Sequence, residues 1–268
     1  MTEINKFKYD IHYTGSKGNS VSVYYKNLGF LLDIGKPYKY IEPFLYDKQF
    51  ILISHKHGDH IKWTTYKKIR ENFPHIKILS NATVQSELTK RKLQPLDVIF
   101  SDDFQFKIGD IKITCIANYH GTGEEFTETQ GWIFETPETN LIYATDLSTT
   151  LDYNVYLQEH NIESIDTILL EANYDERVIE FYESTKKHTG YDVFSNGSYR
   201  HLALSEYDWF VKCYANEHSQ IEMLHTSETY GTFEGLIKKS KGKITQNDVD
   251  NWLNKMYHLF KEDNVNEI

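Results

Sequence analysis

The stretch that decides the fold is "FILISHKHGDH", residues 50–60. Four potential metal ligands follow its apolar start, namely His55, His57, Asp59 and His60. In an extended segment the side chains at i and i+2 point the same way, so His55 and His57 can approach one ion together. Gly58 allows a sharp turn that directs Asp59 and His60 back toward the same place. The stretch therefore predicts a strand followed by two pairs of metal ligands.

One loop does not supply enough groups for two ions about 3.5–4 Å apart, which need roughly six ligands and a bridging group. Three further candidates follow apolar runs: His120 in "ITCIANYHG", Asp146 in "LIYATDLS" and His225 in "IEMLHTSETYG". Alone, each would be unremarkable, because an Asp after a strand most often belongs to a turn. Together they complete a dinuclear set, with His55, His57 and His120 for one ion, Asp59, His60 and His225 for the other, and Asp146 between them.

Composition limits the class of partner. The chain has 268 residues, 40% of them hydrophobic, and a formal charge of −10. No apolar run approaches the roughly 20 residues of a membrane span, and the N-terminus lacks a signal-peptide pattern, so we expect a cytoplasmic protein without a membrane partner. Long nucleic acids are usually held by a basic face, so this charge favours a small anionic substrate. The lysine clusters at 67–70, 90–92 and 238–243 are interpreted as solvated surface.

The periodicity of apolar residues predicts an α/β protein with mixed sheets covered by helices. Strands are expected near 7–14, 20–26, 28–33, 50–53, 76–79, 111–116, 130–136, 140–145, 166–170 and 220–224. Helices are expected near 62–72, 83–92, 176–187, 205–216 and 245–260, the last with an aromatic stripe interpreted as core packing. No linker or repeat divides the chain, so residues 1–268 are interpreted as one domain. Cys115 and Cys213 are interpreted as core thiols.

The set "HKHGDH", His120, Asp146 and His225 resembles the metallo-β-lactamase superfamily. The resemblance implies a four-layer αβ/βα sandwich, two mixed sheets with helices on the outer faces. It also implies two divalent ions, zinc or alternatively manganese or iron, which share these ligands. Asp59 is assigned both to the metal ligands and to the catalytic residues.

Two further residues narrow the reaction. Glu171 ends the run "ILLE", and His201 precedes an expected helix in "SYRHLALSEY". A Glu held against a His outside the metal shell would fix its tautomer and raise its pKa, which makes that His a general acid. This pair resembles the branch that contains tRNase Z and WalJ-type exonucleases. The resemblance implies a phosphodiesterase in which His201, oriented by Glu171, protonates the leaving oxygen.

The residues of the site do not identify the substrate, which is inferred from the charge of the chain and from the resemblance. The chain lacks the basic arm by which tRNase Z enzymes bind tRNA, and it is similar in compactness and acidity to phage anti-Pycsar phosphodiesterases. The first expectation is therefore a 3′,5′-cyclic nucleotide such as cCMP or cUMP, in the host cytoplasm if the protein is phage-encoded. Alternatives are a DNA exonuclease, a tRNase Z-like RNA endonuclease, and a lactonase or thioesterase. Relatives of this kind imply a homodimer. Tyr174, Phe194 and Tyr199 are candidates for base stacking.

Overall fold

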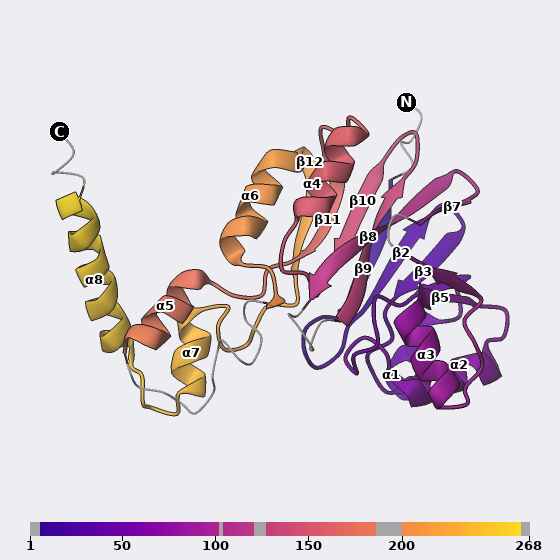
Figure 1. The fold of residues 1–268 in the computed structure, drawn as a ribbon, viewed down its shortest axis with the longest axis horizontal. Helices are drawn as coiled ribbons and strands as arrows, with labels where there is room; N and C mark the ends of the chain where they lie inside the picture. Colours follow the sequence, from indigo (N-terminus) through magenta and orange to yellow (C-terminus); the bar gives the residue numbers. More distant parts are fainter. Residues whose placement is uncertain (1–5, 102–103, 121–126, 186–199, 264–268) are drawn as a thin grey trace.

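The computed structural model describes residues 6–101, 104–120, 127–185 and 200–263, which form two six-stranded sheets (Figure 1). The first sheet has the order β1-β2-β3-β4-β5-β6. Its strands are β1 (Lys8–Tyr13), β2 (Ser20–Tyr25), β3 (Leu28–Leu32), β4 (Phe50–Leu52), β5 (Lys77–Asn81) and β6 (Val98–Phe100). β1, β2 and β3 are antiparallel, and the pairs from β3 to β6 are parallel. The sheet is therefore mixed.

The second sheet has the order β12-β11-β10-β9-β8-β7. Its strands are β7 (Gln105–Ile108), β8 (Ile111–His120), β9 (Thr127–Glu135), β10 (Asn140–Ala144), β11 (Ile165–Glu171) and β12 (Ala215–Leu224). β10, β11 and β12 are parallel, and the pairs from β7 to β10 are antiparallel. The ends of both sets of parallel strands supply the candidate site.

Apolar side chains alternate along the strands and fill the space between the sheets. Phe30 and Leu52 of the first sheet meet Trp132, Phe134 and Leu141 of the second in one buried cluster. Side chains that point inward on facing strands form such a core because burial removes apolar surface from water. The two outer strands are also joined directly, since the Tyr9 hydroxyl of β1 donates to Glu222 of β12.

Helices cover the outer face of each sheet. On the first sheet, α2 (Trp63–Asn72) and α3 (Ala82–Lys90) pack against the outward side chains of β3, β4 and β5. On the second, α4 (Leu151–Glu159) and α6 (Leu204–Tyr214) do the same against β9, β10 and β11. The expected four-layer αβ/βα sandwich is thus confirmed. The short elements α1 (Tyr38–Ile41) and η1 (Glu42–Phe44) follow β3.

A group of three helices lies beside the sandwich (Figure 1). α5 (Glu176–Ser184), α7 (Phe233–Lys239) and α8 (Gln246–Asp263) share a buried cluster of their own. A capping box begins α8, because Thr245 N donates to the Asp248 carboxylate and Asp248 N donates to the Thr245 hydroxyl. The aromatic stripe of α8 is only partly core: Val249 is buried, whereas Leu253 and Tyr257 are 39% and 58% exposed.

Several details differ from the sequence-based expectation. β6, β7, α4 and α7 were not expected, and β12 begins at Ala215, five residues before the expected strand. Arg70 is buried against Asp97 and does not belong to a solvated lysine cluster. Cys115 is buried as expected, but Cys213 is exposed. Among the described residues, no helix combines the length and the apolar character needed to cross a bilayer.

Candidate metal centre

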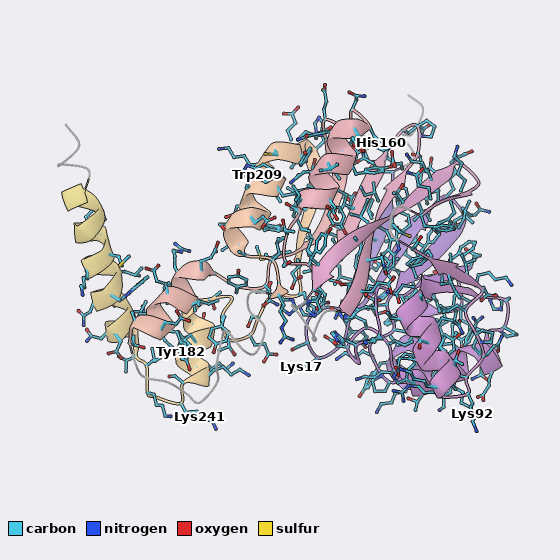
Figure 2. The ribbon with its side chains drawn as sticks, in the orientation of Figure 1. Lys17, Lys92, His160, Tyr182, Trp209 and Lys241 are labelled. Carbon is cyan, nitrogen blue, oxygen red and sulfur yellow. The ribbon has the colours of Figure 1, made fainter. Side chains whose placement is uncertain are left out.

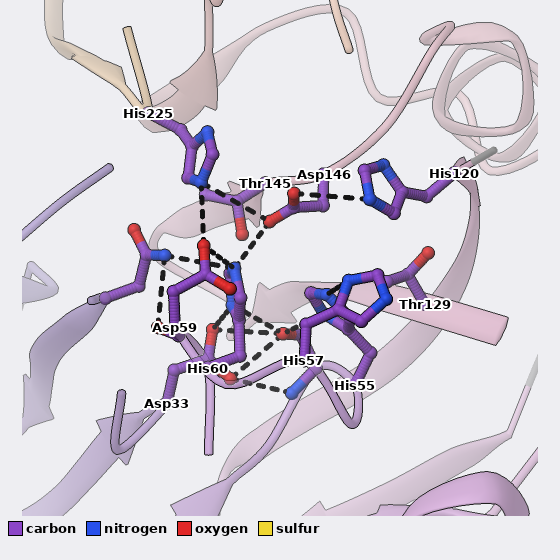
Figure 3. A network of polar contacts seen from close by, with 12 residues as sticks. Asp33, His55, His57, Asp59, His60, His120, Thr129, Thr145, Asp146 and His225 are labelled. Carbon is purple, nitrogen blue, oxygen red and sulfur yellow. Dashed lines mark hydrogen bonds and ion pairs between the residues drawn. The ribbon is translucent and has the colours of Figure 1, made fainter. Parts of the chain in front are cut away.

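The ends of several strands converge between the two sheets (Figure 3). The loop that follows β4 carries the motif of residues 55–60. From the second sheet, His120 ends β8, Asp146 follows β10 and His225 follows β12. Figure 3 shows these three residues on one side of the site and the motif on the other. The structure therefore brings all seven predicted ligands into one network.

The seven side chains include the two groups that the sequence predicts. The candidate ligand atoms of His55, His57 and His120 all lie within 4.8 Å of one another. The same holds for Asp59, His60 and His225. Each group offers histidine nitrogens, and the second also offers a carboxylate, which suits zinc or another first-row divalent ion. The candidate ligand atoms of His55, His60 and Asp146 are equally close to one another, so the two groups adjoin.

Asp146 lies between the groups. One of its oxygens, Oδ1, lies 3.7 Å from His120 Nε2, and the other, Oδ2, lies 2.6 Å from His60 Nε2. Its Oδ2 is also 3.8 Å from His225 Nε2. A carboxylate whose two oxygens face different groups is placed to bridge two ions. This is the position that the sequence assigned to Asp146.

Asp33 is a buried residue of the site that the sequence analysis did not find. Its carboxylate lies 2.7 Å from His60 Nδ1 and accepts hydrogen bonds from the Ser54 backbone N–H and the Ser54 hydroxyl. The Tyr143 hydroxyl of β10 donates to it from the second sheet. An imidazole whose Nδ1–H points to a carboxylate has its Nε2 free for a metal. Asp33 therefore orients His60.

Other ring nitrogens are oriented in the same way. The Nδ1 of His120 lies 3.0 Å from the carbonyl oxygen of Arg200. The Nδ1 of His225 lies 3.3 Å from Glu171 Oε1 and 3.2 Å from the side-chain nitrogen of Asn173. In both residues Nε2 faces Asp146. The hydrogen bonds of the outer nitrogens thus direct the inner nitrogens toward the centre.

The segment "GSKGNS", residues 15–20, forms a turn between β1 and β2 and also touches the site. Asn19 is buried, accepts from the Gly15 backbone N–H and places its amide nitrogen 3.0 Å from His60 Nε2. Its backbone N–H donates to the carbonyl of Asp59. Gly35 lies against the same carbonyl, because a Cβ there would be 1.7 Å from the Asp59 oxygen. The turn thereby fixes the loop that carries Asp59 and His60.

Three residues of the site hold a strained backbone. Asp33, Asp146 and His225 have φ values of 63°, 54° and 53°. Each stands just after a strand, at the point where its side chain turns into the site. Non-glycine residues rarely adopt positive φ, and such residues cluster where function constrains the chain.

His201 and Glu171 form the expected pair. His201 Nδ1 lies 2.6 Å from Glu171 Oε1, and Glu171 is fully buried at the end of β11. The backbone N–H of Leu147 donates to the other carboxylate oxygen of Glu171. His201 Nδ1 is also 3.6 Å from Asp146. The pair therefore borders the candidate ligands, and Glu171 contacts both His201 and His225.

The pKa shifts differ among the histidines of the site. Burial and neighbouring imidazoles lower the pKa of His55 well below its usual value, and burial also lowers the pKa of His57 and His120. Burial opposes protonation of His201 as well, but the charge and hydrogen bond of Glu171 outweigh it and raise the pKa of His201. Burial is likewise outweighed at two candidate ligands: Asp146 and Asp33 raise the pKa of His60 well above its usual value, and Asp146, Asp59 and Glu171 do the same for His225. The raised pKa of His201, together with its contact with Glu171, suits a general acid.

Unsatisfied polar atoms indicate that the residues present fit an ion. Among the described residues, the buried atoms His225 Nε2 and Asp146 Oδ2 lack a well-oriented hydrogen bond. Buried polar groups are usually satisfied, and metal ions would satisfy both of these atoms.

Comparison with known proteins identifies the family. Residues 33–193, more than half of the chain, match the family described as the beta-lactamase superfamily domain. The chain belongs to the β-lactamase superfamily. The match includes Asp33, the "HKHGDH" motif, His120, Asp146 and Glu171, and it ends before His201 and His225. No curated protein matches the sequence closely enough to count as a relative.

Solved structures share the superfamily fold at low sequence identity. The metallo-β-lactamase fold protein YhfI from Bacillus subtilis has a TM-score of 0.62 and 15% identity, over 89% of this chain and 93% of its own. A diphosphatase from the PhnP family has a TM-score of 0.59 and 15% identity, over 85% and 90%. Human tRNase Z, short form, has a TM-score of 0.57 and 14% identity, over 82% and 93%. These similarities concern the fold.

None of the three candidates for base stacking is supported as a free aromatic ring by the described residues. Tyr174 is buried, at 7% exposure, and its segment pairs with Ala203, so it does not offer a free ring. Phe194 and Tyr199 lie outside the described residues. The roles assigned to the seven ligands, Glu171 and His201 stay predictions that their geometry supports.

Proposed function

We propose that this β-lactamase superfamily protein is a metal-dependent phosphodiesterase. The observation that carries the proposal is the contact of 2.6 Å between His201 Nδ1 and Glu171 at the border of the metal centre. Hydrolysis of an unactivated phosphodiester expels an alkoxide, which needs a proton donor. A buried carboxylate that keeps an imidazole protonated supplies such a donor.

The candidate ligands would hold two divalent ions, zinc or manganese. When bound, such ions lower the pKa of water and neutralise charge on phosphate oxygens. His55, His57 and His120 would hold one ion, and Asp59, His60 and His225 the other, with Asp146 shared. Asp59 is 24% exposed in its side chain, which places it at the solvent side of the site, where substrate arrives.

His201 acts on the leaving group. Glu171 accepts from Nδ1 and leaves Nε2 as the nitrogen that gives its proton to the departing oxygen. After cleavage the same nitrogen recovers a proton from water. Glu171 keeps its charge because its pKa is lowered, since the contacts with His201 and His225 outweigh the effect of burial.

We infer that the first substrates to test are 3′,5′-cyclic nucleotides. The formal charge of −10 disfavours a long polyanion but permits a small anion neutralised at the metal centre. The fold similarity to a PhnP-family diphosphatase and to tRNase Z makes phosphate esters a suitable class. A nuclease is the second candidate, because Lys36 and Lys39, which form no ion pair with any residue that the structure describes, lie beside the centre.

One panel tests the proposal. The purified protein, loaded with zinc or manganese, is offered cyclic mononucleotides, bis(p-nitrophenyl) phosphate, DNA, pre-tRNA, a lactone and a thioester, with and without chelator. We expect chelator-sensitive hydrolysis of cyclic nucleotides and of bis(p-nitrophenyl) phosphate. Hydrolysis of the lactone or the thioester alone would overturn the assignment. The expected homodimer is checked on the same samples by sedimentation.

A further inference from the structure

Aromatic and basic side chains gather beside the metal centre, on the first sheet. Tyr13 ends β1, and the segment "KPYKY" of residues 36–40 follows β3. The rings of Tyr13 and Tyr40 are 6.5 Å apart and nearly perpendicular. Lys36 Nζ lies 5.0 Å from the centre of the Tyr13 ring, and Lys39 Nζ lies 4.6 Å from that of Tyr40. We name Tyr13, Lys36, Lys39 and Tyr40 the tyrosine–lysine patch.

The topology places this patch at the same edge as the site. β1 and β3 are both antiparallel to β2, so their last residues lie at one edge of the sheet. Thr14, next to Tyr13, accepts a hydrogen bond of 2.8 Å from the backbone N–H of His225. Lys36 follows Gly35, whose backbone touches the carbonyl of Asp59. Thr14 and Gly35, the chain neighbours of Tyr13 and Lys36, thus contact the backbone of two candidate metal ligands, His225 and Asp59.

The patch is accessible and its charge is not neutralised. Tyr40 is 45% exposed, and Lys39 is exposed. Lys36 and Lys39 form no ion pair with another described residue, whereas Lys17, on the neighbouring turn and labelled in Figure 2, pairs with Glu228. The carboxylate of Glu42, two residues beyond the segment, accepts from the Tyr38 hydroxyl. Lys36 and Lys39 thus offer two positive charges beside the candidate metal centre.

Aromatic rings interleaved with lysines form the kind of surface that binds single-stranded nucleic acid. Bases stack on the rings and the cations meet the phosphates, with stacking worth about 1–3 kcal/mol per base. We propose that the tyrosine–lysine patch binds one nucleotide of a single strand next to the nucleotide held at the metal centre. The base stacks on Tyr40, and Lys36 and Lys39 contact its phosphates. This inference rests on the proposed phosphodiesterase activity and extends it to linear strands.

The test compares substrates of different length. Tyr40→Ala and the double variant Lys36→Ala/Lys39→Ala are assayed with a ten-nucleotide oligouridylate, the equivalent oligothymidylate and bis(p-nitrophenyl) phosphate. We expect KM for the strands to rise about tenfold, with kcat for the strands and turnover of the small diester unchanged. Matched controls are Tyr46→Ala, an exposed tyrosine outside the patch, and Lys107→Ala on β7; both should match the parent.

Binding separates this inference from the proposed function. Anisotropy of a labelled oligouridylate, measured in chelator so that no cleavage occurs, should give a salt-dependent affinity whose log–log slope falls by roughly 1.4 in the double-lysine variant. If the parent hydrolyses small diesters but neither binds nor cleaves strands, the patch inference is wrong and the phosphodiesterase stands. If the strands bind through the patch but no diester is cleaved, the proposed function is wrong. If the patch variants lose equal activity on the strands and on the small diester, the proposed role of the patch is wrong.

Discussion

The oxygens of Asp33 determine how one candidate ligand is oriented. Asp33→Asn keeps the size of the side chain but removes the charge that faces His60 Nδ1. We expect the affinity for the second metal ion to fall about 10–100-fold, because such outer carboxylates fix the ligand tautomer. Competition with a fluorescent chelator measures it. Asp152→Asn, on α4 at the outer face of the sandwich, is the control and should bind metal normally. Unchanged affinity in Asp33→Asn would contradict the orienting role.

If His201 protonates the leaving oxygen, the effect of removing it on kcat should depend on the leaving group. His201→Ala should keep the metal content and lower kcat by about 10²–10⁴-fold for cyclic nucleotides, with a smaller loss for p-nitrophenolate, which departs without a proton. Because Glu171 raises the pKa of His201, the acid form persists to higher pH. The fall in kcat at alkaline pH should therefore disappear in the variant. Equal activity of both proteins on cyclic nucleotides would remove His201 from the mechanism.

The site residues that could be predicted from the sequence are those marked by a local pattern. The HxHxDH spacing places four ligands in one loop, and a histidine or aspartate after an apolar run marks a strand end, so all seven come together as expected. Asp33 and Asn19 were missed because a carboxylate or amide after a strand is usually a turn residue. Their importance comes from contacts with His60, which is 27 and 41 positions away.

Among the elements, α2 is joined to the first sheet by an ion pair in which Arg70 is buried and Asp97 is partly exposed. Arg70 Nη1 donates to Asp97 at 2.6 Å, and Arg70 also donates to Pro95 O and to the Tyr66 hydroxyl. Removing one partner of a buried pair leaves the other uncompensated, which costs about 3–5 kcal/mol when both are fully buried. Asp97 is 23% exposed in its side chain and also pairs with Lys77, so Arg70→Ala should lower the free energy of unfolding in urea by a smaller amount, about 1–2 kcal/mol.

The control for this variant lies on the same helix. Lys67→Ala removes an exposed pair with Glu71 and should change stability by less than about 1 kcal/mol. Burial would raise the pKa of Asp97, but hydrogen bonds from the Ile78 N–H and Arg70 outweigh it and lower that pKa below 3.8. A lowered carboxyl pKa stabilises the fold fully above about pH 3.8. This stabilisation is lost as the pH falls through the lowered pKa. Arg70→Ala should therefore lose less stability on acidification than the parent; a steeper loss would contradict the pairing.

Helices and strands were predicted correctly where apolar residues recur with a clear helical or strand periodicity. The strands around β2–β5 and β8–β11 and the helices α2, α3, α5, α6 and α8 lie close to their expected ranges. β6 and β7 are three and four residues long, so they offer too little alternation to identify. In α4, buried and exposed positions both carry apolar or aromatic residues, such as Tyr153 and Leu151, so the periodicity is weak. Tertiary packing decides such elements.

Across the whole molecule, the candidate ligands come from both sheets. The loop after β4 on the first sheet supplies four, and β8, β10 and β12 on the second supply His120, Asp146 and His225. Each of the two groups in the centre contains residues from both sheets. Bound ions would therefore connect the two halves of the sandwich at one end, where polar contacts replace the apolar core.

Metal removal should consequently destabilise the fold. A ligand that binds only the native state stabilises it by about 2.7 kcal/mol at a free concentration of 100 times Kd, which for a chain of this size corresponds to roughly 5–10 °C in Tm. Calorimetry with and without added zinc measures the shift. Asp146→Ala should reduce it, because Asp146 faces both groups, and His160→Ala, at the end of α4, should retain it in full. The same Tm for metal-loaded and metal-free protein, with one or more ions found per chain, would show that the ions do not join the sheets.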